Sequence, residues 1–414
     1  MTCDNLPPPQ LNQPQCRSES PRGSVPPAPS ATIASDMGTL TRRAFVQAAS
    51  FATLAAAGTG TGSFAAPSRQ RVFLGTNTAD GIQAFDWDPA TAELTPAGLA
   101  AKLSNVDWLV LSPDRKYIYA ASEVDSFNGK PTGEVASYEY ANGKITPISA
   151  QNSAAKGTCH VGLDHTGRVL ISADYGGGAA ASFKITAGRL SPAVWTEHYT
   201  QHGPNPDRQE SAHAHFASFS PDNRFAFVND LGGDCIHIYN LDAETAQLTP
   251  AGKYAGKPGS GPRTLHFHPN GVTAYCMNEL NSTVDVLHWN KADGSFKLLH
   301  TVSLLDHPSK AVSTGCDTVI TRDGKFVYFA NRGEDFLYSF KADPGTGALT
   351  PIARSNCGGK TPRNFVLDPT EKWMLVANQN SGLVSVFARN PQTGELANEG
   401  KNFKCPSPMR ILFA

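Results

Sequence analysis

The sequence has few charged residues and almost no net charge. Only 17% of its 414 residues are charged, with 35 Lys and Arg against 36 Asp and Glu and a formal net charge of -1 at pH 7. A surface that binds nucleic acid or an anionic membrane needs an excess of basic residues on one face. We therefore expect neither of these partners.

Several motifs of common enzyme and metal-binding folds are also missing. The sequence has no G-x-S-x-G motif, so the serine mechanism of α/β-hydrolases is not expected. None of the eight Cys residues forms a C-x-x-C pair, which argues against a zinc ribbon or a thioredoxin-like motif. Most of the six Cys residues after residue 70 are expected to be buried and reduced, although their disulfide state stays open: Cys159, Cys235, Cys276, Cys316, Cys357 and Cys405.

Residues 1–66 differ from the rest of the chain and predict an export leader. Residues 1–36 are rich in Pro, Ser, Gln and Asn, a composition that cannot bury enough apolar surface to become ordered. The pair Arg42 and Arg43, an Ala-rich apolar stretch over 45–58 and a run of small residues ending at Ala66 then indicate a twin-arginine signal peptide. We expect the twin-arginine translocase to be a partner during export, and we expect this protein to be periplasmic or secreted.

The leader also bears on the membrane and on the start of the mature chain. Its apolar stretch is shorter than the ~18 residues that spanning requires, so no stable membrane span is expected after signal removal. The mature chain is expected to begin near Pro67, and both Met1 and Met37 stay open as the start of translation.

The body of the chain, residues 67–414, repeats itself about every 50 residues. A turn of the type Ser112-Pro113-Asp114 recurs, with copies that start at 112, 164, 220, 268, 321 and 368. A segment of the type Leu-Thr-Pro recurs seven times, centred on Leu94, Ile145, Leu190, Leu248, Phe296, Leu349 and Leu396. Such a unit holds three or four short strands and no helix, which is typical of propeller blades. We predict an all-β, seven-bladed β-propeller.

The two ends of this body are expected to complete one blade together. The first unit has strands from Arg71 onward but lacks the Pro-Asp turn, and the segment 407–413 alternates like an inner strand without successors. Pairing of the N- and C-terminal strands in one shared blade removes two open sheet edges.

Polar residues recur at the ends of the strands that would line the central channel. Five residues before the turn starts are Asp107, Cys159, His215, Arg263, Cys316 and Arg363. Ten residues after the turn starts are Ser122, Asp174, Asp230, Asn278, Asn331 and Asn378. Eleven residues after the turn starts are Glu123, Tyr175, Leu231, Glu279, Arg332 and Gln379. Arg binds carboxylate or phosphate by paired hydrogen bonds, and His and Glu exchange protons. These positions predict a site for an anionic or polyhydroxylated small molecule at one channel mouth.

Two pairs of His residues have a spacing that metal sites use. His213 and His215 lie on one strand face, as do His266 and His268, but no carboxylate cluster accompanies either pair. His268 also falls at the opposite end of its strand from Arg263. We predict no bound metal and no cofactor.

Two segments carry a resemblance to a known family. The strings GPRTLHFHPN at 261–270 and AYCMNELNSTVDV at 274–286 resemble the signature of bacterial propeller 6-phosphogluconolactonases, and the resemblance covers roughly residues 71–414. The same family includes fungal carboxy-muconate lactonising enzymes, whose catalytic His, Glu and two Arg match the following residues here: His215, Glu279, Arg263 and Arg332. The resemblance implies that these four residues are catalytic.

We therefore expect hydrolysis of a sugar-acid lactone by a monomer. The predicted substrate-binding residues are Arg363, Asn278, Asn331, Asn378, His160 and His213. Because the cytosolic relatives carry no export signal, both 6-phosphogluconolactone and an unphosphorylated aldonolactone stay open as substrates. Two other functions also stay open, a non-catalytic propeller that binds a ligand or protein and a muconate-type lactonising enzyme.

Overall fold

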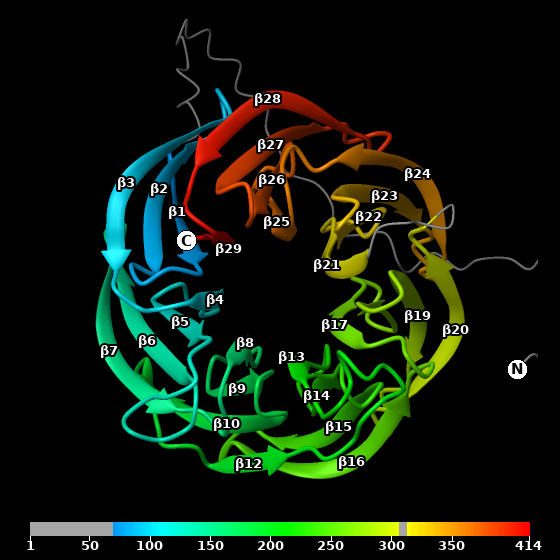
Figure 1. The fold of residues 1–414 in the computed structure, drawn as a ribbon. Helices are drawn as coiled ribbons and strands as arrows, with labels where there is room; N and C mark the ends of the chain where they lie inside the picture. Colours follow the sequence, from blue (N-terminus) through cyan, green and yellow to red (C-terminus); the bar gives the residue numbers. More distant parts are fainter. Residues whose placement is uncertain (1–68, 306–312) are drawn as a thin grey trace, which may run out of the picture. The chain divides into compact units, whose positions relative to one another are not determined.

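The computed structural model describes residues 69–305 and 313–414, which form seven antiparallel sheets with no helix among them (Figure 1). The innermost strands of neighbouring sheets contact one another all round a central axis. This arrangement confirms the predicted all-β, seven-bladed propeller. The predicted leader, residues 1–66, lies outside the described residues. Within the described part of the chain, no helix is long and apolar enough to cross a membrane.

Each blade has an innermost strand that faces the channel and a second strand that follows it. The innermost strands are β29 (Pro408–Phe413), β4 (Val106–Leu111), β8 (Thr158–Leu163), β13 (Ala214–Phe219), β17 (Pro262–Phe267), β21 (Thr314–Ile320) and β25 (Pro362–Leu367). The second strands are β1 (Gln70–Thr76), β5 (Tyr117–Ser122), β9 (Val169–Asp174), β14 (Phe225–Asp230), β18 (Thr273–Asn278), β22 (Phe326–Arg332) and β26 (Trp373–Asn378).

Two further strands complete each blade toward the rim. The third strands are β2 (Ile82–Asp88), β6 (Glu134–Ala141), β10 (Ala179–Thr186), β15 (Cys235–Asp242), β19 (Thr283–Trp289), β23 (Phe336–Ala342) and β27 (Leu383–Arg389). The outer strands are β3 (Glu93–Ala101), β7 (Lys144–Asn152), β11 (Arg189–Leu190) with β12 (Trp195–His198), β16 (Gln247–Ala255), β20 (Phe296–Ser303), β24 (Leu349–Asn356) and β28 (Leu396–Lys404). All seven predicted Leu-Thr-Pro-like segments begin or lie in these outer strands.

In the six blades other than the first, a Pro-Asp-type turn joins the innermost strand to the second strand. In the turn between β4 and β5, Ser112 Oγ accepts hydrogen bonds from the N–H groups of Lys116 (3.2 Å) and Tyr117 (2.9 Å) and donates one to Asp114 Oδ1 (2.6 Å). Arg115 adopts a left-handed φ of 59° and donates its N–H to the Ser112 carbonyl. The repeated Ser, Asp or Thr at the turn start therefore stabilises the hairpin.

Ring closure follows the prediction from the two chain ends. Strand β29 pairs antiparallel with β1, and Val72 lies opposite Phe413 and Leu74 opposite Ile411. Figure 1 shows the C-terminus beside β1, at the inner end of the first blade. The first blade is therefore built from both ends of the chain, which leaves neither strand as an open edge.

The core lies between neighbouring blades. Every residue of β14 and of β18 is buried, whereas most of β20 at the rim is exposed. One apolar cluster joins Phe227 of β14 to Leu265 of the next innermost strand, β17, and similar clusters follow between the other blades. All six described Cys residues are buried and unpaired, as predicted.

Bulges near the start of the innermost strands position polar or thiol side chains in the six blades other than the first. The register against the second strand shifts around the following residues: Asp107, Cys159, His215, Arg263, Cys316 and Arg363. A bulge leaves the extra residue outside the hydrogen-bonded ladder and redirects its side chain. These residues are the first polar set predicted from the repeat, so the bulges build the head of the channel.

Candidate active site

The heads of the innermost strands surround a cavity of about 160 Å³. Eight residues line it: Glu123, Cys159, Tyr175, Arg208, His215, Glu279, Arg332 and Arg363. Three of them occupy bulges, three follow a second strand, and Arg332 ends β22. The two polar sets predicted from the repeat therefore meet in one cavity.

Glu279 is the centre of an ion-pair cluster in this cavity. Its Oε2 lies 2.9 Å from Arg263 Nε and 2.8 Å from Arg332 Nη2, and its Oε1 accepts a hydrogen bond of 2.6 Å from Arg208 Nη2. Arg263 also donates to the backbone carbonyl of Cys316. Three guanidinium groups surround one carboxylate, so the cluster keeps an excess of positive charge that suits an anion or a developing oxyanion.

His215 lies beside this cluster on the bulge of β13. Its Nε2 is 4.0 Å from Glu279 Oε2, and its ring meets the edge of Tyr175 with the centroids 5.5 Å apart. On the other side, Cys159 Sγ lies 4.0 Å from His215 Nδ1 and donates a hydrogen bond to the His215 carbonyl. The four residues implied to be catalytic, His215, Glu279, Arg263 and Arg332, thus lie together.

Nearby positive charge keeps Glu279 ionised, whereas burial keeps His215 uncharged. Burial alone would raise the pKa of Glu279, but Arg332, Arg263, His215 and Arg208 together hold this pKa far below its usual value, so the carboxylate is ionised. Burial lowers the pKa of His215 well below its usual value, and Arg263 adds to the effect. At neutral pH the imidazole is therefore uncharged and able to accept a proton.

Glu123 is a second titratable carboxyl in the cavity. Burial, together with the nearby charge of Asp107, raises the pKa of Glu123 to about 7, against the opposing effect of Arg363 and Arg263. A carboxyl group with such a pKa is suited to donate a proton near neutral pH.

Arg363 lines the cavity but is paired within the protein. Its Nη2 donates to both oxygens of Asp107, at 3.2 and 2.9 Å. This ion pair joins the bulge of β25 to that of β4, so it braces two innermost strands while one side of the guanidinium faces the cavity.

His160 lies in the next layer of the channel. Its ring packs between Trp108 and Phe216, at centroid distances of 4.4 and 3.9 Å, and its Nδ1 accepts the N–H of Ala217. The guanidinium of Arg410 stacks over the Trp108 ring, 3.9 Å from the ring centroid. The predicted substrate-binding residue His160 thus belongs to an aromatic layer and does not line the cavity; a small internal space of about 10 Å³ lies between His160 and His215.

His213 supports the cavity from outside its lining. Its ring stacks on Tyr175 with the centroids 4.4 Å apart, and its Nδ1 donates to the Tyr175 carbonyl. Its Nε2 lies 3.3 Å from Glu210. His213 therefore orients Tyr175, which accepts a hydrogen bond from Arg208.

The three predicted Asn residues are not brought to the cavity lining. Asn278 Nδ2 donates to Thr283 Oγ1, Asn331 Nδ2 to Ser313 Oγ and Tyr338 Oη, and Asn378 Nδ2 to Ser385 Oγ. Each amide therefore connects the end of a second strand to nearby loops and strands instead of lining the cavity.

Arg208 is a cavity residue that the sequence analysis did not select. Arg208 comes from the loop between β12 and β13, which interrupts the repeat and has no counterpart in the other blades. Tyr175 and Glu123 stand one position after the second strand, in phase with Glu279, and the repeat placed them at the channel mouth without a predicted catalytic or binding role.

The two His pairs considered for metal binding do not converge. His213 stacks on Tyr175 whereas His215 faces Glu279, and His266 pairs with Asp317 while His268 lies against the Gly324 carbonyl. Neither pair directs its nitrogens to one point.

Comparisons with known proteins agree with this fold and site. A family model described as "Lactonase, 7-bladed beta-propeller" matches residues 71–413. The 6-phosphogluconolactonase of Bacillus subtilis is 32% identical over 347 residues, which are 82% of this chain and 97% of that protein. The 6-phosphogluconolactonase of Formosa agariphila is 32% identical over 337 residues, 78% of this chain and 94% of that protein.

A solved structure shows the same architecture. The periplasmic gluconolactonase PpgL of Pseudomonas aeruginosa has a TM-score of 0.79 and 31% identity, over 84% of this chain and 99% of that chain. The match of the family model to nearly all of the described residues, together with these relatives, assigns the family: this chain belongs to the lactonase family of seven-bladed β-propellers.

Proposed function

We propose that the protein hydrolyses a sugar-acid lactone in the cavity around Glu279. The observation that carries the proposal is an uncharged His215 beside a carboxylate that three Arg residues surround. An ester carbonyl needs a base for the attacking water and positive charge for the oxygen that becomes negative, and the cavity offers both. Relatives described as 6-phosphogluconolactonase and gluconolactonase support the same reaction.

The Arg residues would bind and polarise the lactone. Arg263 and Arg332 hold Glu279 from one side and Arg208 from the other, so their remaining N–H groups are available for a carbonyl oxygen. Glu279 positions these groups, and its low pKa makes it a poor base. The guanidinium groups stabilise the negative charge that the carbonyl oxygen acquires when water adds.

His215 would accept the proton of the attacking water. The hydroxide oxygen forms a bond to the carbonyl carbon, and the bond from that carbon to the ring oxygen breaks. Glu123 would give its proton to the ring oxygen, which leaves as a hydroxyl group. One water is consumed, and the product is the open hydroxy acid.

An unphosphorylated aldonolactone is the proposed substrate. The cavity of about 160 Å³ is small and polar, and Arg363, the additional cation in its wall, is already paired with Asp107. The related PpgL is described as a periplasmic gluconolactonase, and the predicted leader of this chain would direct it to the same location. We propose export through the twin-arginine translocase, a periplasmic or secreted location and a monomeric state as parts of this function.

The test is lactone hydrolysis by the purified protein, followed as acid release in a pH-indicator assay. Gluconolactone and 6-phosphogluconolactone are compared, and spontaneous hydrolysis is subtracted. The His215→Ala variant is expected to lose about 100-fold or more in turnover because it lacks the base. The exposed His288 on β19 supplies a matched control, and His288→Ala is expected to retain full activity.

The outcome also separates the alternative functions. Activity of His215→Ala equal to the natural protein would remove His215 from the mechanism. A folded protein that opens neither lactone, but binds one of them, would instead be a binding propeller. Ring closure of a muconate by the same cavity would favour a lactonising enzyme.

A further inference from the structure

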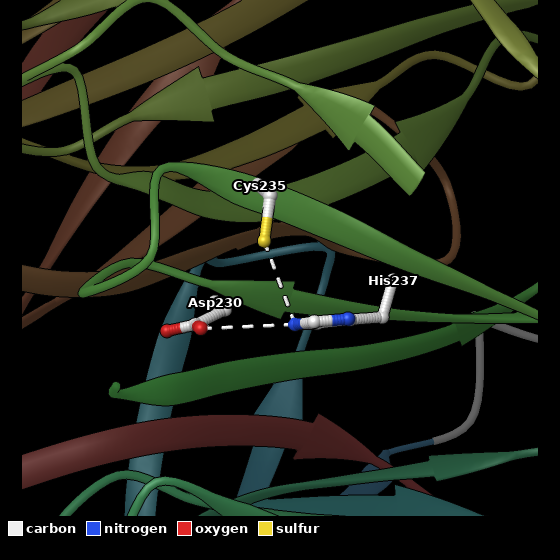
Figure 2. Close-up of side chains that lie close together, drawn as sticks. All are labelled: Asp230, Cys235 and His237. Atoms are coloured by element: carbon white, nitrogen blue, oxygen red, sulfur yellow. Dashed lines mark hydrogen bonds and ion pairs between the residues drawn. The ribbon is translucent and has the colours of Figure 1, made fainter. Parts of the chain in front are cut away.

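A second cluster of reactive side chains lies outside the cavity, where β14 turns into β15. Figure 2 shows Asp230 at the end of β14 and Cys235 and His237 on β15, with one imidazole nitrogen directed at both the thiol and the carboxylate. Cys235 Sγ lies 3.5 Å from His237 Nε2, and the same nitrogen lies 3.7 Å from Asp230 Oδ2. All three side chains are buried.

The carboxylate of Asp230 is held with one oxygen aimed into this cluster. Its Oδ1 accepts hydrogen bonds from the N–H groups of His213 (2.8 Å) and Gly233 (3.0 Å). Asp230 is fully buried, and its Oδ2 accepts no hydrogen bond from any residue that the structure describes. A buried carboxylate oxygen without a partner is costly, so this one requires a positively charged neighbour.

The corresponding positions in other blades lack this combination. Asp174 occupies the same place at the end of β9, but its Oδ1 accepts the Thr158 hydroxyl and its Oδ2 accepts two backbone N–H groups. The residues that correspond to Cys235 and His237 are Ala179 and Ala181 in that blade. The thiol and imidazole are therefore a feature of one blade and not of the repeat.

The separations of His237 Nε2 from the other two ligand atoms are close to those around a tetrahedral metal ion, and all three ligand atoms lie within 4.8 Å of one another. Zinc binds at about 2.3 Å from sulfur and about 2.0–2.2 Å from nitrogen and oxygen, which places neighbouring ligands about 3.4–3.6 Å apart. The observed separations of 3.5 and 3.7 Å agree with these edges. A direct hydrogen bond between His237 and Asp230 would instead need about 3 Å.

Gln201 lies beside Asp230 in this cluster. A Cβ placed on Gly233 would lie 2.4 Å from Asp230 Oδ2 and 2.7 Å from Gln201 Cβ, so the Gln201 side chain lies next to the carboxylate. The buried Gln201 Oε1 has no hydrogen-bond partner among the described residues. The lack of a side chain at Gly233 thus leaves the space between Asp230 Oδ2 and the Gln201 side chain unfilled.

We infer that Asp230, Cys235 and His237 form a binding site for Zn²⁺, with the fourth position taken by Gln201 or water. A thiolate with an imidazole selects zinc over magnesium or calcium, which prefer oxygen ligands alone. This site departs from the prediction that the protein binds no metal. It is separate from the lactone cavity, and its role is structural.

A metal at this position would brace one wall of the lactone cavity. Asp230 holds the backbone of His213, and His213 orients Tyr175 and immediately precedes Ala214, the first residue of β13. Zinc would fix this segment and link the two strands of the β14–β15 hairpin. Zinc is therefore expected to raise the stability of the folded chain, an effect that can be measured independently of lactone hydrolysis.

Cobalt binding tests the inference directly. Protein freed of metal with a chelator is titrated with Co²⁺, and its visible and near-ultraviolet spectrum is recorded. We expect saturation at one Co²⁺ per chain, a thiolate-to-cobalt charge-transfer band, and displacement of that band by Zn²⁺. Thermal unfolding is expected to move to a higher Tm with Zn²⁺, because the ion binds only the folded chain.

Variants identify the ligands. Cys235→Ser is expected to lose the charge-transfer band, and Asp230→Asn to bind at least about tenfold more weakly. Cys405→Ser is the matched control, since Cys405 is also a buried thiol but lies in another blade, and it should keep the band. A natural protein without the band would overturn the inference, as would a band of equal strength in Cys235→Ser, and neither result depends on lactone hydrolysis.

Discussion

Three guanidinium groups share the Glu279 carboxylate, and they differ in their contact with water. The side chain of Arg263 is only 4% exposed, that of Arg332 is 16% exposed and that of Arg208 is 38% exposed. The carboxylate therefore stabilises the charges of Arg263 and Arg332 most, because these two side chains have lost most of their contact with water. Removal of a partner from a buried ion pair leaves uncompensated charge, which costs more than the pair itself contributes.

Replacement of Glu279 by Gln is expected to weaken the fold as well as the reaction. The free energy of unfolding should fall by about 3 kcal/mol, because Arg263 and Arg332 would keep their charge without a carboxylate. Urea denaturation of the two proteins measures the difference. Glu399→Gln, at an exposed position on β28, is the control and should change stability by less than about 0.5 kcal/mol. Equal stability of Glu279→Gln and the natural protein would show that the ion pairs of Glu279 do not stabilise the fold.

The pH dependence of the rate follows from the two shifted groups. His215 acts as a base only when it is neutral. Because its pKa lies well below the usual value of about 6.5, the imidazole stays neutral at pH values below 6.5, and the acid limb of the profile should lie below that pH. Glu123 acts as an acid only when it is protonated, and its pKa of about 7 places the alkaline limb near pH 7. The kcat/KM profile is expected to peak on the acidic side of neutrality.

Glu123→Gln is expected to lower the rate and to remove the alkaline limb near pH 7. The profile is measured with spontaneous hydrolysis subtracted at each pH, and Glu395→Gln at an exposed turn is the control. A Glu123→Gln variant that keeps the limb would assign it to another group and would remove Glu123 as the proton donor.

At the scale of single strands, the bulges explain why the site could be predicted only in part. The Pro-Asp turn fixes the phase of each repeat, so the positions of His215, Arg263 and Arg363 could be counted from it. The bulge itself has no residue signature, because residues as different as Cys159 and Arg363 occupy it. The sequence therefore indicated which residues head the innermost strands, but not which layer His160 would enter.

Residues outside the repeat escaped prediction for a related reason. Arg208 reaches Glu279 from a loop, and a loop has no periodicity that relates its residues to the strands. Asn278, Asn331 and Asn378 are in phase with the site, but their amides satisfy local loops, a choice that depends on neighbours such as Tyr338 and Ser385. Phase places a residue near a channel mouth but does not set the direction of its side chain.

Position within the blade also decides how much a residue contributes to stability. Ile411 of the closing strand β29 is 1% exposed and packs in the cluster between the first and last blades. Ile411→Ala is expected to lower the free energy of unfolding by about 2–5 kcal/mol, because it leaves a cavity in that cluster. Leu298→Ala, at a position 44% exposed on the outer strand β20, should cost less than about 0.5 kcal/mol. Denaturant unfolding of both variants gives the comparison, and similar losses would contradict the assignment of the core to the inner strands.

For the whole molecule, the ring is held closed without a covalent link. No disulfide joins the described Cys residues, and the ring is completed where β29 pairs with β1 and the Ala414 N–H donates to the Arg71 carbonyl. The two ends of the described chain therefore meet in the first blade. Seven blades around one axis share their interfaces, so the loss of one closing strand affects both neighbouring interfaces.

Deletion of residues 408–414 is expected to open the ring. The deletion uncovers the edge of β1 and removes Met409 and Ile411 from the core, so both a sheet edge and apolar surface are exposed. We expect self-association in size-exclusion chromatography and loss of the single cooperative unfolding transition. Deletion of Ala414 alone leaves the strand pairing in place and should keep a monomer with nearly natural stability. A protein without residues 408–414 that stays monomeric and unfolds at the natural denaturant concentration would show that the other six sheets hold the ring without the shared blade.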